Sequence, residues 1–75
     1  MSQYSAVNGK ALIKALRNVG FDVLPIKGSL YFLRHPDGRT TVIPAHSGES
    51  LGPGLLAKIL RDIDKTRDDL EELLS

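Results

Sequence analysis

The chain has 75 residues, of which 41% are hydrophobic and 25% are charged, so it is long enough for one globular domain with one modest core. It contains no cysteine, which excludes disulfide bonds, thiolate metal sites and a cysteine nucleophile. No apolar run approaches the length of a membrane span or of a signal-peptide core, so we expect a single cytoplasmic domain over residues 1–75.

The net charge of +1 is unevenly distributed along the chain. Residues 1–61 carry eight lysine and arginine residues against three acidic residues, a net charge of +5, whereas residues 62–75 carry two against six, a net charge of −4. A basic binding surface would account for this asymmetry, and so would an acidic solvated helix with scattered surface lysines. The charge alone leaves both interpretations open.

The first predicted helix begins after Asn8, whose side chain can accept a hydrogen bond from the free amides of a first helical turn. It ends at Gly20, because glycine adopts the left-handed conformation that follows many helices without strain. Apolar residues recur between them at helical spacing, which predicts one buried side. Lys10, Lys14 and Arg17 lie on the other side.

Three extended runs follow, each of a length suited to one strand, at residues 21–26, 30–35 and 40–45. Asp37 and Gly38 predict a tight hairpin between the second run and the third. Proline cannot donate to a sheet ladder and therefore belongs on an edge strand. Pro25 lies in the first run and Pro44 in the third, so the strand order 1-2-3 places both prolines on edges. This predicts an antiparallel meander.

Two further helices are predicted after a polar loop. Pro53 suits the first turn of the second helix, and Thr66 with Asp69 resembles a capping box at the start of a short third helix. The third helix should bury Leu70, Leu73 and Leu74. The layout is therefore α+β, in the order α-β-β-β-α with a short C-terminal helix. The helices should cover one face of the sheet and leave the other face, or its rim, to a ligand.

Few residues suggest catalysis or metal binding by their spacing alone. The stretch 52–54 is too short for a phosphate-binding loop and lacks the lysine that such a loop requires. Two histidines, His35 and His46, without any cysteine do not predict a metal site, and their spacing does not demand a shared one. The acidic residues at 68–72 are typical of a solvated helix face. We expect no cofactor.

The hairpin between residues 27 and 39 combines basic residues with two small residues, Gly28 and Ser29. A lysine beside two small residues lets backbone and side-chain donors approach a phosphate closely. The candidate RNA-binding residues are Lys27, Gly28, Ser29, Arg34, His35 and Arg39. A charged hairpin rim also keeps a sheet edge soluble, so the residues by themselves leave a purely structural role open.

A family resemblance adds to this interpretation. The matching segments are "NVGF" at the end of the first helix, "KGS" before the second strand, "RHPDGR" at the hairpin and "TVIPAHSGESLGPGLLAKIL" across the third strand and second helix. In their order, spacing and total length the chain resembles the HicA family of bacterial toxins, small mRNA interferases with a double-stranded-RNA-binding-domain-like fold. The resemblance implies an endoribonuclease of a type II toxin–antitoxin system. Its partners would be mRNA and a HicB-type antitoxin, with no membrane and no DNA contact.

The chain departs from the family at one position. The family's pattern is Gly-Ser-His with a catalytic histidine, and Gly28 and Ser29 match it, but Leu30 stands in place of the histidine. Leucine cannot transfer a proton, and the loss of one general acid–base group costs about 10²–10⁴-fold in rate. The resemblance thus implies a chain that cleaves poorly or not at all. The alternative function is a non-catalytic RNA- or protein-binding module of the same fold.

Three interpretations of Leu30 remain open. In the first, the leucine is a deliberate substitution that spares the host. In the second, the protein is a natural paralogue that binds RNA without cutting it. In the third, His35 or His46 has taken over the proton transfer. Alternation along the strand places Leu30 and Phe32 on the same face. If that face points outward, the two form part of an exposed apolar patch, which is typical of a binding site for a partner such as the antitoxin.

Overall fold

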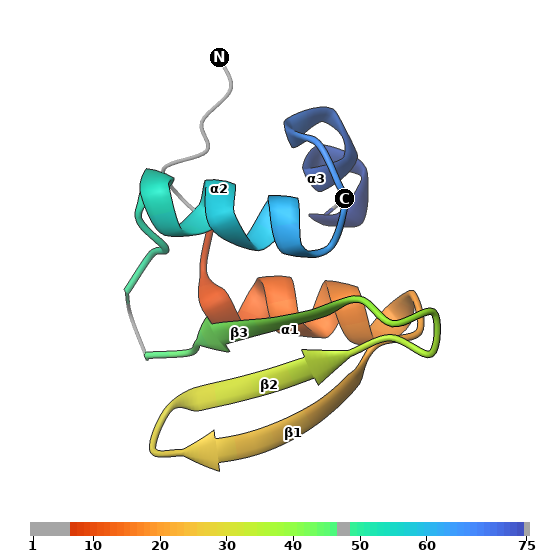
Figure 1. The fold of residues 1–75 in the computed structure, drawn as a ribbon. Helices are drawn as coiled ribbons and strands as arrows, with labels where there is room; N and C mark the ends of the chain where they lie inside the picture. Colours follow the sequence, from red (N-terminus) through yellow and green to blue (C-terminus); the bar gives the residue numbers. More distant parts are fainter. Residues whose placement is uncertain (1–6, 47–48, 75) are drawn as a thin grey trace.

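The computed structural model describes residues 7–46 and 49–74, and its elements follow the predicted order (Figure 1). Three antiparallel strands form an open sheet, and three helices complete an α+β fold consistent with the double-stranded-RNA-binding-domain-like fold of HicA proteins. The elements are α1 Gly9–Asn18, β1 Asp22–Lys27, β2 Leu30–Arg34, β3 Thr40–Pro44, α2 Pro53–Asp62 and α3 Arg67–Leu74. Among the described residues, none of the helices is long and apolar enough to cross a membrane.

Local side-chain chemistry sets the helix ends where the sequence predicts them. Oδ1 of Asn8 accepts the backbone N–H of Lys10 at 2.8 Å, and Gly20 follows α1 with a φ of 106°. At α3, Thr66 and Asp69 form the predicted capping box, in which each side chain accepts the other's backbone N–H, at 2.8 and 3.2 Å. The bond from the backbone N–H of Thr66 lowers the pKa of Asp69 below 3.8.

The sheet has the strand order β1-β2-β3, so the predicted meander is confirmed and both prolines lie on edge strands. β2 and β3 pair without interruption, with Leu30 opposite Pro44 and Arg34 opposite Thr40. Pairing between β1 and β2 shifts by one residue near the β1–β2 turn, between Pro25 and Lys27. Edge positions tolerate proline because their outward N–H groups have no ladder partner to lose.

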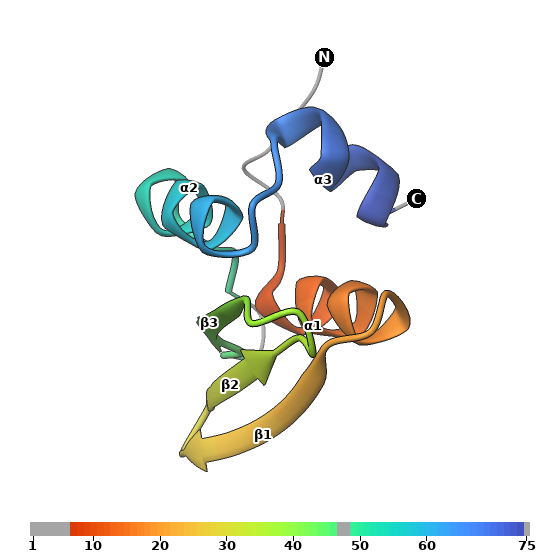
Figure 2. The same cartoon turned by 45° about the vertical axis from the view of Figure 1, so that its right-hand side comes forward.

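The core lies between one face of the sheet and the helices (Figures 1 and 2). Alternation along the strands directs Leu33 and Ile43 into this core, where both are completely buried together with Leu12, Leu16 and Ile59 of the helices. Leu70 anchors α3, but Leu74 remains 38% exposed, so the prediction that Leu74 is buried is wrong. Leu74 is the last residue of α3. The core lies on the Leu70 side of that short helix.

The opposite face of the sheet is left open by the described helices (Figure 2). Leu24, Phe32 and Val42 are cross-strand neighbours on it, and Leu24 and Val42 are 45% and 39% exposed. Leu30 lies on the same face, 39% exposed, directly opposite Pro44. We call this surface the open face, defined by Leu24, Leu30, Phe32, Val42 and Pro44. Among the described residues, the prediction that the helices cover one face of the sheet and leave the other uncovered is confirmed.

Candidate functional site

The six candidate RNA-binding residues do not form one cluster. Lys27, Gly28 and Ser29 precede β2, whereas Arg34 ends β2 and His35 follows it. Because a strand rises about 3.3 Å per residue, Ser29 and His35 lie roughly 20 Å apart. We therefore distinguish the turn end, residues 27–29 with the segment after β3, from the hairpin end, residues 34–39.

At the hairpin end, His35 and Arg39 are held by the protein's own residues. The His35 ring packs edge-on against Phe21 with centroids 5.0 Å apart, and the Arg39 guanidinium lies 5.2 Å from the centre of the same ring. Arg39 donates through Nη1 to the carbonyl of Ile63 at 2.7 Å and through Nε to Asp37 at 2.8 Å. Most of the polar capacity of His35 and Arg39 therefore closes the hairpin onto the core.

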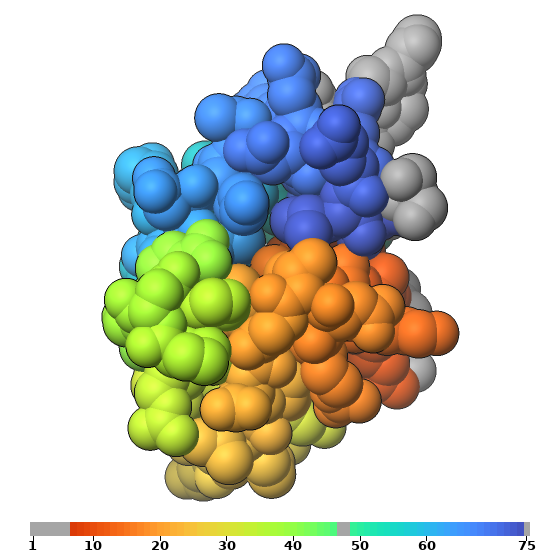
Figure 3. Space-filling view, turned by 90° about the vertical axis from the view of Figure 1, so that its right-hand side faces the viewer, coloured from red at the N-terminus to blue at the C-terminus, as the bar shows by residue number. Residues whose placement is uncertain are grey.

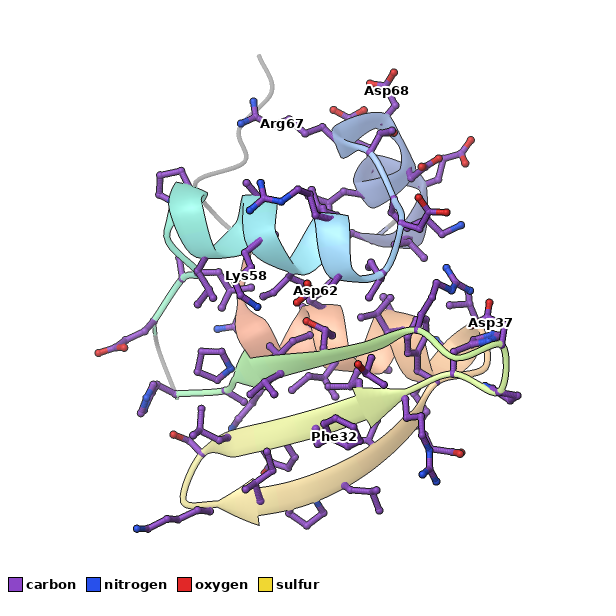
Figure 4. The ribbon with its side chains drawn as sticks, viewed as in Figure 1. Phe32, Asp37, Lys58, Asp62, Arg67 and Asp68 are labelled. Atoms are coloured by element: carbon purple, nitrogen blue, oxygen red, sulfur yellow. The ribbon has the colours of Figure 1, made fainter. Side chains whose placement is uncertain are left out.

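Electrostatics at this end support the same conclusion. Desolvation would raise the pKa of Asp37, but the backbone N–H of Arg39, its guanidinium and the nearby His35 outweigh it and lower the pKa below 3.8. Figure 3 shows the hairpin in green against the end of α2 in blue and the α1–β1 region in orange. Figure 4 shows Asp37 at the hairpin, away from the turn end.

Arg34, in contrast to His35 and Arg39, is exposed on the sheet face that carries Phe32.

At the turn end, the residues are accessible. Gly28 occupies a left-handed turn position with a φ of 58°, and a Cβ there would meet no atom within 4 Å. Lys27 is exposed beside it, and Ser29 is half-buried. The carbonyl of Ser29 accepts the N–H of Ala45 at 2.7 Å, which ties the turn to the segment after β3.

That segment brings His46 to Ser29. Oγ of Ser29 lies 3.0 Å from Nδ1 and 3.2 Å from Nε2 of His46, so the hydroxyl sits close to both ring nitrogens. The sequence analysis did not link these two residues. The hairpin register could have found them, because Leu30 opposite Pro44 places Ser29 opposite Ala45, one residue before His46.

The segments that precede α1 and α2 contact each other beside the residues that follow β3. The carbonyl of Val7 accepts the N–H of Leu51 at 2.8 Å, and Asn8 Nδ2 donates to the carbonyl of Glu49 at 3.3 Å. A cleft of about 140 Å³ lies between His46 and the start of α2, with Glu49 in its wall. The turn end thus combines a basic turn, a hydroxyl and an imidazole, a set of groups suited to a phosphodiester.

One protein-family model matches most of the chain. The family model described as HicA toxin of bacterial toxin-antitoxin matches residues 9–64, from the first residue of α1 to two residues beyond α2. No curated protein matches the sequence. The matched segment contains the whole sheet, the turn end and the hairpin end, and it leaves out only α3 among the elements. It spans well over half of the chain, which therefore belongs to the HicA toxin family of bacterial toxin–antitoxin systems.

Proposed function

We propose that this protein is an RNA-binding toxin with the scaffold of an endoribonuclease that acts on mRNA, and that its cleavage chemistry is impaired at Leu30. The observation that carries this proposal is the accessible turn end, where the exposed Lys27 and Gly28 adjoin Ser29, whose hydroxyl contacts His46, within the matched family region. Ammonium, hydroxyl and backbone N–H groups are the usual donors to a nucleic-acid phosphate.

The geometry favours unequal roles for the six candidates. The turn end would hold the phosphate next to the reacting bond, because Gly28 leaves space for close approach of the backbone. Arg34 would hold a second phosphate of a strand running along the sheet. His35 and Arg39 would contribute mainly by fixing the hairpin, since Phe21 and Ile63 already engage them.

Leu30 would account for weak chemistry. It lies beside Ser29 at the start of β2, and its side chain offers only apolar surface to the open face. If a histidine at this position supplied the proton transfer, its replacement would slow cleavage by about 10²–10⁴-fold. Binding of RNA through Lys27 and Ser29 would persist.

Family membership implies an antitoxin partner, and we propose that a HicB-type antitoxin docks on the open face. Leu24, Leu30 and Val42 expose between 39% and 45% of their surface side by side, and an exposed apolar patch of this kind is typical of a protein-binding site. A partner seated there would also reach the turn end, because Leu30 adjoins Ser29. This face equally supports the second candidate function, a protein-binding module that does not engage RNA.

A salt titration of RNA binding separates the two functions. Each lysine–phosphate contact adds about 0.7–0.9 to the slope of the logarithm of affinity against the logarithm of salt concentration. We expect Lys27→Ala to weaken RNA binding and to reduce the slope by the amount of about one phosphate contact. Arg61→Ala, at the exposed end of α2, is the control and should leave the affinity and the slope unchanged. Affinity that is independent of salt, or insensitive to Lys27→Ala, would contradict RNA binding at the turn end and favour the protein-binding module.

A further inference from the structure

We infer that His46, held against the hydroxyl of Ser29, is a proton-transfer residue for RNA cleavage at the turn end. This inference rests on the proposed function, because it assumes that RNA lies across residues 27–29. It assigns a role to a residue outside the strand that carries Leu30. The protein would then cleave RNA slowly without a proton-transfer group at position 30.

The two histidines of the chain differ sharply in their surroundings. His35 packs against Phe21, and its Nδ1 contacts both the backbone N–H and a carboxylate oxygen of Asp37, at 3.2 and 3.1 Å. His46 is exposed and lines a cleft, and the hydrogen-bond partner of its ring is the hydroxyl of Ser29. Only His46 is therefore both accessible and adjacent to the basic turn.

Its position is set by backbone contacts as well as by its own side chain. The N–H of Ala45 donates to the carbonyl of Ser29, and Gly9 of α1 packs directly against the carbonyl of Pro44. These contacts fix the backbone immediately before His46 on both sides. The imidazole thus starts from an anchored Cα, which is what a proton-transfer group needs to remain within reach of a bound hydroxyl.

Ser29 would act as a positioning residue. Its hydroxyl, which can both donate and accept a hydrogen bond, lies within hydrogen-bonding distance of the ring. Glu49 lines the same cleft as His46, and Lys27 ends β1 two residues before Ser29. Lys27 would attract the phosphate.

The step balances without a further reagent. A nitrogen of His46 takes the proton of a ribose 2′-hydroxyl, and the freed oxygen forms a bond to the adjacent phosphorus. The bond between phosphorus and the 5′-oxygen breaks, and the departing oxygen takes a proton from water. His46 then returns its proton to the solvent. The products are a 2′,3′-cyclic phosphate and a 5′-hydroxyl.

The test is single-turnover cleavage of an RNA oligonucleotide by excess full-length protein, with RNA affinity measured in parallel. We expect slow cleavage that yields the cyclic phosphate and that is abolished by a 2′-deoxy substitution in the oligonucleotide. His46→Asn should lower the rate by about 10²–10⁴-fold while RNA affinity and thermal unfolding stay close to those of the parent. Ser29→Ala should lower both RNA affinity and the cleavage rate, whereas Ser29→Thr, which keeps the hydroxyl beside His46, should retain both.

The outcomes separate the inference from the proposed function. Cleavage that survives His46→Asn would overturn the inference. Cleavage of the 2′-deoxy substrate would reveal a contaminating nuclease. RNA binding without any cleavage by the parent would overturn the inference and leave the RNA-binding function standing. Absence of RNA binding would remove both.

Discussion

The contact between α1 and the end of β3 offers the sharpest test of the turn-end geometry. A Cβ built on Gly9 would overlap the carbonyl oxygen of Pro44 and lie only 3.2 Å from Cα of Ala45. Both neighbours are backbone atoms, so no side chain can rotate away. Gly9→Ala therefore has to move α1 relative to β3, or to displace the backbone immediately before His46.

The magnitude follows from two opposing effects. Alanine is favoured over glycine within a helix by about 0.5–1 kcal/mol, which would stabilise the variant. Overpacking against a fixed backbone costs about 1–3 kcal/mol or more, because the elements must shift. Because the overlap at Gly9 is with backbone atoms, we expect the overpacking cost to exceed the gain, so that the free energy of unfolding falls by about 1–2 kcal/mol. In a domain of this size that loss lowers the melting temperature by about 4–16 °C.

Gly54→Ala is the matched control, because Gly54 is also in the first turn of a helix and a Cβ there would meet no atom within 4 Å. It should be neutral or stabilising. Thermal unfolding and urea titration followed by circular dichroism would measure both variants. If Gly9→Ala were as stable as the parent or as Gly54→Ala, the close packing of α1 on the end of β3 would be refuted.

Other consequences of the structure can be measured in the same way. Leu33→Ala in the core should cost about 2–5 kcal/mol in urea titration, whereas Leu24→Ala on the open face should cost well under 1 kcal/mol, and equal costs would contradict the assignment of the two faces. Val42→Lys should leave the melting temperature nearly unchanged and weaken antitoxin binding at least tenfold by calorimetry, and unchanged binding would place the partner elsewhere. The hydrogen bond from Lys58 holds the pKa of Asp62 below 3.8, so its stabilisation is present above that pH and is lost as the pH falls through the lowered value (Figure 4). Asp62→Asn should therefore be less stable than the parent near pH 6, with a difference that shrinks toward pH 2; a constant difference would contradict this role.

Much of the fold could be predicted because local chemistry and topology agree. The prolines at 25 and 44 select the edges of the sheet, and Asp37 with Gly38 fixes the hairpin between β2 and β3. Asn8, Thr66 and their partners mark helix ends through hydrogen bonds that span two or three residues. These signals act over short distances along the chain, so the sequence contains them directly.

The arrangement of the candidate site could not be predicted in the same way. Residues 27–39 are close in sequence, but an extended strand separates their two ends, and the roles of His35 and Arg39 depend on Phe21 and Ile63, which come from distant segments. The pairing of Ser29 with His46 spans 17 residues and depends on the register of β2 and β3. Tertiary contacts of this kind leave little trace in composition or spacing.

The most direct measurement of the central claim compares RNA cleavage by the parent chain and by Leu30→His at equal RNA affinity. If the turn end holds RNA and lacks its principal proton-transfer group, the variant should cleave about 10²–10⁴-fold faster. A folded Leu30→His protein that binds RNA and cleaves it no faster than the parent would contradict the claim.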